Sequence, residues 1–279
     1  GPMGIGFAVM DPLAETIIVD TTVDVASPIS GVDEILWTGS DFQVVWTGTF
    51  TDSTGTDSEV MVTTVDASGA RLGADVVLTD FRADGRYSLL GERMGTWNGS
   101  RTGVAWTAHM SPAGADWYDP VQYLVFGEGD DPGEPVTITS ESQITSLVDL
   151  EWGGSEFWIA WQELMAAHNA LVISTIDESG SRTREDVVLE TTAGPRDCDL
   201  LWTGAGFVVL MPALGLISIV VLDESGSVII DAPVVSLPTD NRQARAIWTG
   251  SEIGLSWLND ATGSSEYDRL MFTRIGFCD

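Results

Sequence analysis

A tryptophan-led pattern recurs five times along the 279-residue chain and constrains its fold more than any other feature. Each copy opens with Trp, has Gly two residues later, and has an aliphatic residue seven positions after the Trp. A second Trp stands nine positions after the opening residue in four copies, and Met211 replaces it in the fourth copy. The opening residues are spaced by 60, 55, 50 and 46 residues: Trp37, Trp97, Trp152, Trp202 and Trp248. Such periods are typical of propellers, solenoids and repeat arrays.

The local period of two identifies each copy as β-structure. In 35–37 and 42–46 large apolar residues recur at every second position, as in strands with one buried face. The intervening 38–41 supplies turn residues, with Gly39 able to adopt a positive φ. A third strand, an Asp-x-Ser-Gly turn and a fourth strand follow, most clearly at 60–66, 171–177 and 217–223 and then at 75–78, 186–189 and 233–236. Four antiparallel strands in about 50 residues make one propeller blade.

We therefore predict an all-β fold, a five-bladed β-propeller of four-stranded antiparallel blades that forms a single domain over 1–279. The expected blades are about 31–85, 86–143, 144–195, 196–241 and 242–279. Within the segment 3–30, the strand 16–20 is expected to join the last blade and close the ring. Residues 7–11 and 270–276 both resemble third strands, and the sequence does not decide between them. Gly1-Pro2 resembles a tag scar.

The repeat also resembles a known family. The pattern Trp-x-Gly-Ser-x-Phe-x-Val-x-Trp, followed by a strand that ends in Asp-x-Ser-Gly, is similar to a repeat of secreted and cell-surface bacterial propeller proteins. The resemblance covers nearly the whole chain. It implies a propeller in the extracellular space or the cell envelope, but no particular activity, because most members of that family have no known one.

Charge excludes two classes of partner. The chain has 12 basic residues, all Arg, against 42 acidic ones, for a formal charge of −30. A nucleic-acid groove needs clustered cations, and an anionic membrane surface repels such a chain. The longest apolar run, 207–222, is interrupted by Pro212 and Gly215, so no transmembrane helix is expected. We expect a monomer without a cofactor, calcium excepted.

The repeated tryptophans are interpreted as core residues that fill the wedges between blades, although a ring of sugar-binding platforms is the alternative. Trp117 and Trp158 fall outside the repeat, and Trp158 is expected to point away from its neighbours Phe157 and Ile159. Cys198 and Cys278 match no metal-binding spacing. They are two idle thiols or one disulfide.

The loops between second and third strands vary most and are expected to share one face of the propeller, where function is favoured. There the aromatic, carboxylate and imidazole groups suit sugar hydroxyls and the apolar face of a sugar ring. The alternative is an acidic, solvated surface. The residues proposed for ligand binding on this face are His109, Asp116, Trp117, Tyr118, Asp119, Tyr267 and Asp268.

The inner strands supply a second candidate site. Three residues before each opening Trp stand Glu34, Met94, Asp149, Asp199 and Arg245, around the expected mouth of the channel. Glu151 replaces an aliphatic residue of other blades and therefore needs a polar partner. Glu34, Asp149 and Asp199 are the catalytic candidates if the protein is a glycosidase. Arg245 and Glu151 are counted with the ligand-binding residues, and structural Arg–carboxylate pairs are the alternative.

A calcium site is a third hypothesis. Residues 128–134 concentrate four carboxylates, the hard oxygen ligands that calcium prefers: Glu128, Asp130, Asp131 and Glu134. The segment lacks the spacing of a known calcium loop and belongs to a hairpin turn.

The sequence favours a non-catalytic recognition propeller that binds a carbohydrate or protein surface through its loop-rich face. A glycoside-active enzyme with carboxylates at the channel mouth is one alternative, and a purely structural module is another.

Overall fold

The computed structural model describes residues 4–10, 16–51, 56–79, 90–108, 119–139, 145–164, 169–191, 198–260 and 269–276, and every regular element in these ranges is a β-strand. Within them, no helix is long and apolar enough for a membrane crossing. The chain divides into two compact units, Gly1–Gln143 and Ile144–Asp279.

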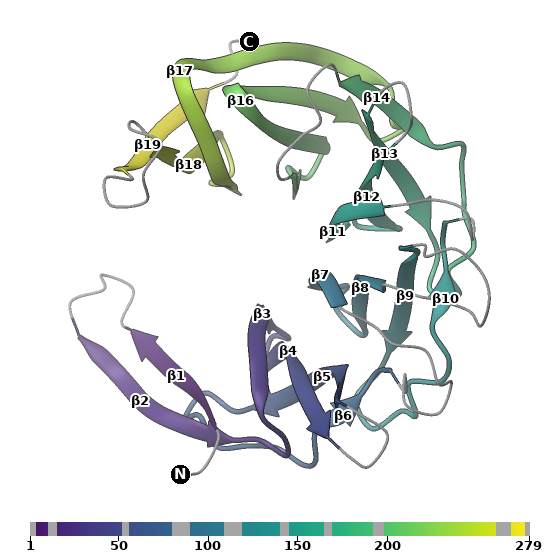
Figure 1. Cartoon of the computed structure of the whole chain (residues 1–279), viewed down its shortest axis with the longest axis vertical. Helices are drawn as coiled ribbons and strands as arrows, with labels where there is room; N and C mark the ends of the chain where they lie inside the picture. Colours follow the sequence, from purple (N-terminus) through teal and green to yellow (C-terminus); the bar gives the residue numbers. More distant parts are fainter. Residues whose placement is uncertain are drawn as a thin grey trace. The chain divides into compact units, whose positions relative to one another are not determined.

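The first unit contains three antiparallel sheets (Figure 1). A two-stranded sheet consists of β1 (Gly4–Met10) and β2 (Ile17–Asp24). A four-stranded sheet follows, with β3 (Ile29–Trp37), β4 (Phe42–Thr51), β5 (Thr56–Val65) and β6 (Val76–Val77) in chain order. The next repeats this order with β7 (Leu90–Trp97), β8 (Thr102–Ala108), β9 (Val121–Phe126) and β10 (Val136–Thr137).

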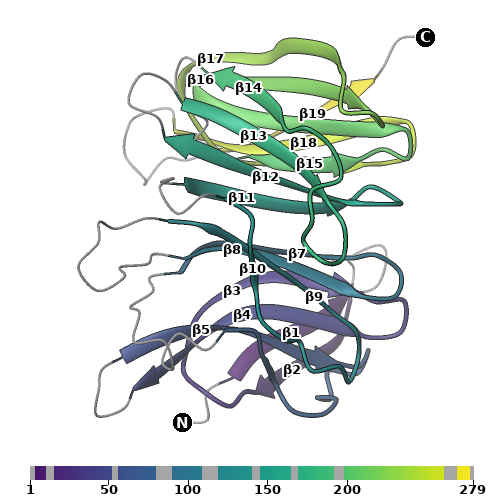
Figure 2. The same cartoon turned by 90° about the vertical axis from the view of Figure 1, so that its right-hand side faces the viewer.

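The second unit contains two antiparallel sheets. The four strands of the first lie in chain order and can be followed in Figure 2: β11 (Thr145–Trp152), β12 (Phe157–Leu164), β13 (Asn169–Ile176) and β14 (Val187–Thr191). The other has the order β15 (Asp199–Trp202), β16 (Gly206–Asp223), β17 (Val228–Trp248), β18 (Glu252–Asp260) and β19 (Arg269–Gly276).

This five-stranded sheet contains parts of two repeats. Strand β16 folds back on itself. Its two ends lie side by side, since a side chain at Gly206 would collide with the carbonyl oxygen of Leu222. A straight strand would separate these residues by about 50 Å. The long curved strand β17 (Figure 1) pairs with β16 between Val228 and Asp240 and with β18 between Asp240 and Trp248. It therefore supplies the outer strand of one repeat and the inner strand of the next.

Strand β17 crosses the expected boundary between the fourth and fifth blades at 241/242, and the two units divide at 143/144. Both segments that resemble third strands are strands: β1 pairs with β2, and β19 pairs with β18. The expected pairing of 16–20 with the last blade is not among the strand pairs of the described residues, where β2 pairs with β1.

The second Trp of each repeat is a core residue, as predicted. Trp46, Trp106, Trp161 and Trp257 are at most 4% exposed. Trp106 packs with Val45 and Val60 of the preceding sheet, so it fills the space between two consecutive blades of the first unit. Burial of such a ring contributes roughly 2–3 kcal/mol.

The opening Trp behaves differently, and the core prediction is wrong for Trp37, which is 50% exposed. Its ring packs on Phe42 across the hairpin, with 4.6 Å between ring centroids, and Trp152–Phe157 and Trp202–Phe207 repeat this contact. The opening Trp ends its strand at the hairpin turn, where Gly39 and its equivalents have the predicted positive φ. Trp37 therefore covers its turn, whereas Trp202 and Trp248 also pack against clusters formed by two consecutive repeats.

Replacing Trp106 by Ala is expected to lower the free energy of unfolding by about 3–5 kcal/mol, because it opens a large cavity between two sheets. Trp37→Ala is the matched control, since it truncates the same side chain at a half-exposed position. Its expected cost is below about 1 kcal/mol. Chemical denaturation of both variants measures the difference, and equal losses would contradict the assignment of the second Trp to the core.

An aspartate organises the turn between third and fourth strands in three repeats. Asp66 Oδ1 accepts hydrogen bonds from the Ser68 hydroxyl and from the backbone N–H groups of Ser68 and Ala70, at 2.6, 2.8 and 3.0 Å. Asp177 and Asp223 make the same contacts in their own turns. These bonds, led by the serine hydroxyl, lower the pKa of Asp66, Asp177 and Asp223.

Because the folded-state pKa of these carboxyls lies below the unfolded value, their contribution is present above the unfolded pKa of about 3.9 and is lost as the pH falls through the folded pKa. We expect the stability difference between the wild type and an Asp66→Asn/Asp177→Asn/Asp223→Asn variant to shrink between about pH 5 and about pH 2. Urea denaturation across this range measures it, and a difference that does not change with pH would contradict the assignment.

Candidate functional site

Buried carboxylates connect the inner strands of the second unit. Asp149 in β11 is 4% exposed, and its Oδ2 accepts a hydrogen bond from the backbone N–H of Leu200 in β15. Asp199 in β15 is 8% exposed, and its Oδ2 accepts from the backbone N–H of Ala246 in β17, at 2.6 Å. Both aspartates stand three residues before an opening Trp, and both amides stand two residues before the next one. The same hydrogen bond therefore joins two consecutive pairs of inner strands.

These bonds satisfy groups that the sheets leave without a partner. Adjacent inner strands of different blades share no ladder, so a backbone N–H that faces the neighbouring blade needs a side-chain acceptor. A carboxylate is a strong acceptor, and its own burial requires such donors. Asp149 has a second one, because its Oδ1 accepts from the backbone N–H of Leu150 at 2.8 Å.

The other inner-strand candidates are less buried. Glu34 in β3 is half-buried, and its Oε1 accepts from the backbone N–H of Ile35 at 3.2 Å. Arg245 in β17 is exposed and donates to the carbonyl oxygen of Ala244 at 2.9 Å. Glu151 is half-buried in β11, opposite Trp158 of β12. The structure thus brings Asp149 and Asp199 onto neighbouring strands with Glu151 two residues along, while Glu34 belongs to the first unit.

Most of the predicted loop site lies outside the described residues: His109, Asp116, Trp117, Tyr118, Tyr267 and Asp268. Asp119 is described and is half-buried just before β9. Cys198 is buried, and Cys278 lies outside the described residues.

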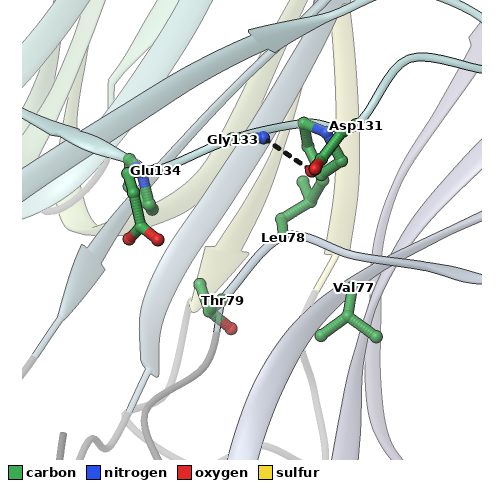
Figure 3. Close-up of a pocket in the computed structure, with 8 residues that line it drawn as sticks. Val77, Leu78, Thr79, Asp131, Gly133 and Glu134 are labelled. Carbon is green, nitrogen blue, oxygen red and sulfur yellow. Dashed lines mark hydrogen bonds between the residues drawn. The ribbon is translucent and has the colours of Figure 1, made fainter. Parts of the chain in front are cut away.

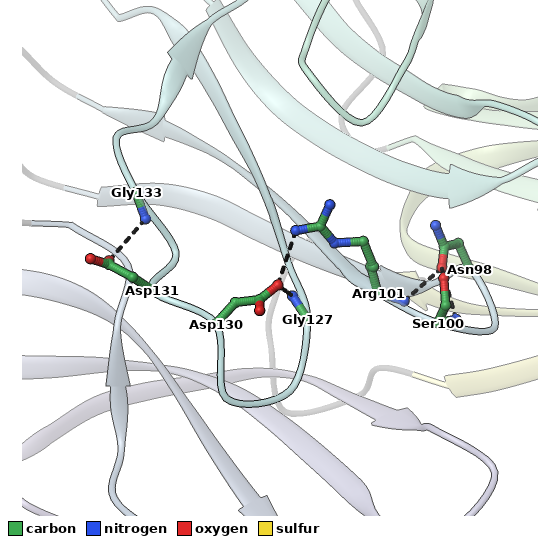
Figure 4. Close-up of polar contacts among 7 residues, drawn as sticks. All are labelled: Asn98, Ser100, Arg101, Gly127, Asp130, Asp131 and Gly133. Atoms are coloured by element: carbon green, nitrogen blue, oxygen red, sulfur yellow. Dashed lines mark hydrogen bonds and ion pairs between the residues drawn. The ribbon is translucent and has the colours of Figure 1, made fainter.

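The acidic segment 128–134 is described in full, and two of its four carboxylates, Asp130 and Asp131, have structural partners (Figure 4). Asp130 Oδ2 accepts from Arg101 Nη2 and from the backbone N–H of Gly127, both at 3.1 Å. Asp131 Oδ1 accepts from the backbone N–H of Gly133 at 3.2 Å. Among the described residues, no group of three or more His, Cys, Asp or Glu could hold a metal ion. The predicted calcium loop therefore presents no preassembled set of ligands.

A pocket of about 370 Å³ lies in the first unit between the end of β6 and the segment that leads into β10 (Figure 3). Val77, Leu78, Thr79, Asp131 and Glu134 contribute to its lining. The Thr79 hydroxyl is already used, because it donates to the Glu59 carboxylate at 2.5 Å and accepts from the backbone N–H of Val60 at 2.9 Å. Among the described residues that line this pocket, none is an aromatic ring on which a sugar could stack.

A second pocket, of about 320 Å³, lies in the second unit. Its lining combines three turn residues, two tryptophans and two charged residues: Gly153, Gly154, Ser155, Trp158, Trp202, Arg184 and Glu224. Trp158 stacks on Phe207 of the next repeat, with 4.3 Å between ring centroids, so it points toward that repeat. The Arg184 guanidinium lies over the Trp158 ring, 5.5 Å from its centroid. Sequence reasoning missed Arg184, although aligning the turns between third and fourth strands would have revealed a residue peculiar to one repeat.

No protein-family profile matches the sequence, and no curated protein matches it. Solved structures do resemble the chain. A thermostable family-43 glycoside hydrolase is 8% identical, with 91% of this chain and 92% of that one covered and a TM-score of 0.54. The Trypanosoma rangeli sialidase is 9% identical (97% and 49% covered, TM-score 0.56), and a Bacillus halodurans xylan β-1,4-xylosidase is 10% identical (90% and 54% covered, TM-score 0.51).

These likenesses concern the fold and support the β-propeller class for this chain. The chain spans about half the length of the sialidase and xylosidase structures that it matches.

Asp149→Ala and Asp199→Ala are each expected to destabilise the protein by about 1–3 kcal/mol, because each removes the acceptor of an inter-blade backbone N–H. Glu185→Ala removes an exposed carboxylate of the same unit and serves as the control, with an expected effect within about 0.5 kcal/mol. Equilibrium denaturation measures all three. Aspartate variants as stable as the control would rule out a structural role for the two hydrogen bonds.

Proposed function

We propose that this chain is a carbohydrate-active β-propeller that cleaves glycosidic bonds, with Asp149 and Asp199 as its acidic pair. The observation that carries the proposal is the placement of these two carboxylates on adjacent inner strands, β11 and β15. Glycoside cleavage requires two carboxyl groups on either side of the scissile bond, one to protonate the leaving group and one to act as nucleophile or base. Glu34, at the equivalent position of the first repeat, is the third carboxylate of the proposal.

The similar solved structures support this choice over the non-catalytic recognition module that the sequence favours. They are a glycoside hydrolase, a sialidase and a xylosidase, which are enzymes that act on carbohydrates. Each shares the fold over most of this chain. A carbohydrate is accordingly the proposed partner, and the recognition module is the outcome expected if the protein binds glycans without turnover.

The architecture proposed for this function is a five-bladed ring closed through the N-terminal strand. Five tryptophan-led repeats in register support it, together with antiparallel sheets whose strands follow the repeats in chain order. We further propose a monomer outside the cytoplasm, on the basis of the repeat's resemblance to secreted propellers.

Turnover of chromogenic xylosides, arabinosides, fructosides and sialosides, and of a polysaccharide panel, tests the activity. The wild type is expected to cleave at least one substrate class, and Asp149→Asn and Asp199→Asn to lower kcat/KM by about a hundredfold or more, as expected for loss of a catalytic carboxyl. Asn retains an oxygen acceptor for the inter-blade N–H, so the fold should persist, and unfolding midpoints check this.

Glu185→Gln is the matched control, because it makes the same change at an exposed carboxylate and should leave kcat/KM unchanged. A wild type that is inactive on the whole panel, or aspartate variants as active as the control, would contradict the proposal.

A further inference from the structure

The third repeat departs from the other four at two positions and from the two others with an aspartate turn at a third, and the three departures meet in the second pocket. One residue after the opening Trp, the other copies have Thr38, Asn98, Thr203 and Thr249, whereas the third copy has Gly153. Six residues after the opening Trp, Trp158 replaces Gln43, Gly103, Val208 and Gly254. Seven residues after the turn aspartate, Arg184 replaces Gly73 and Ile230. Gly153, Trp158 and Arg184 all line the pocket.

Gly153 lacks a side chain that would stabilise the turn, and this leaves room for the indole of Trp158. In the other hairpins this position supports the turn: Thr38 and Thr203 donate to a backbone carbonyl, and Asn98 accepts backbone N–H bonds. A Cβ on Gly153 would lie 2.8 Å from Trp158 Nε1 and 3.0 Å from the Phe207 ring. The third repeat therefore gives up a turn-stabilising side chain in favour of a fixed indole. Local rules are broken in this way chiefly at functional sites.

The groups around the pocket are held in place before any ligand arrives. Trp158 is 3% exposed, is stacked on Phe207, and has its far edge 3.6 Å from the position of a Cβ on Gly226. Arg184 donates to the carbonyl oxygen of Glu224 and forms an ion pair with Glu156. Trp202 is half-buried against Phe207. A preorganised site loses little conformational entropy on binding.

We propose that this pocket is a second, non-catalytic binding site for a neutral sugar of one or two rings. The half-buried Trp202 offers an apolar face to ring C–H groups, and the exposed Ser155 hydroxyl and Glu224 carboxylate offer a donor and an acceptor for sugar hydroxyls. The charge of Arg184 is balanced by Glu156, so Glu224 leaves the site net negative and disfavours an anionic sugar. A volume of about 320 Å³ is at the small end of ligand pockets.

The site is separate from the proposed catalytic carboxylates. The glycine turn that lines the pocket begins directly after Trp152. Asp149 lies three residues before Trp152, which is about 10 Å along β11. The carboxylate of Asp149 is directed to the N–H of Leu200 rather than to the pocket. The proposal does not depend on turnover, because its readout is binding, so either proposal can fail without the other.

Saturation-transfer NMR of the full chain tests the site with a sugar panel: glucose, galactose, mannose, xylose, N-acetylglucosamine, cellobiose, maltose and xylobiose, with glucuronic acid and sialic acid as anionic probes. At least one neutral sugar is expected to receive saturation. Its Kd should rise about tenfold or more in Trp202→Ala, which corresponds to loss of one good contact.

Trp152→Ala is the matched control, because Trp152 has the same position in its repeat and the same Phe contact but does not line the pocket. Its Kd should stay within about twofold of the wild type. Glu224→Gln retains the backbone carbonyl that accepts from Arg184 but removes the carboxylate proposed to bind sugar hydroxyls, so it should also weaken binding. This second variant tests the proposal if Trp202→Ala does not fold. No neutral-sugar binding, binding of anionic sugars alone, or equal effects of the variants at 152 and 202 would overturn the proposal.

Discussion

Each blade of this chain is a thin sheet that cannot bury both of its faces, so packing between consecutive blades supports the rest of the structure. In the first unit Trp106 and the valines of the preceding sheet fill this space. In the second unit Trp257 packs with Val208 and Leu210 in the same way. The apolar contacts are non-directional and do not set how far one inner strand is shifted along the next. The hydrogen bonds of the Asp149 and Asp199 carboxylates fix that relative position.

The same inner-strand position therefore serves structure and supplies the chemistry of the proposed function. A buried carboxylate between blades is held rigidly, which is what positioned catalytic groups require. The pocket at the hairpin turns of the third and fourth repeats depends on the same packing, because Trp158 is fixed on Phe207 of the following repeat. Both proposed sites thus arise where one repeat meets the next.

Much of the fold could be predicted from the sequence, because the repeat encodes it locally. The period of two, the turn glycines and the Asp-x-Ser-Gly turns all act within about ten residues. The partners of the carboxylates could not be predicted, because Asp149 bonds a residue 51 positions away and Asp199 one 47 positions away. Trp37 was misassigned because the sequence shows its apolar character and its place at the strand end, but not that half of its side chain stays exposed there. Arg184 is unusual only in comparison with Gly73 and Ile230, the residues at the same position of two other repeats.

Native-state hydrogen exchange of the Leu200 and Ala246 amides tests most directly whether the carboxylates hold neighbouring blades together. If Asp149 and Asp199 accept these N–H groups in solution, both amides exchange as slowly as the ladder amides of β12, through cooperative unfolding. Exchange as fast as that of the exposed turn amides at Gly154 and Ser155 would contradict the account, because the inner strands would then be joined by apolar packing alone.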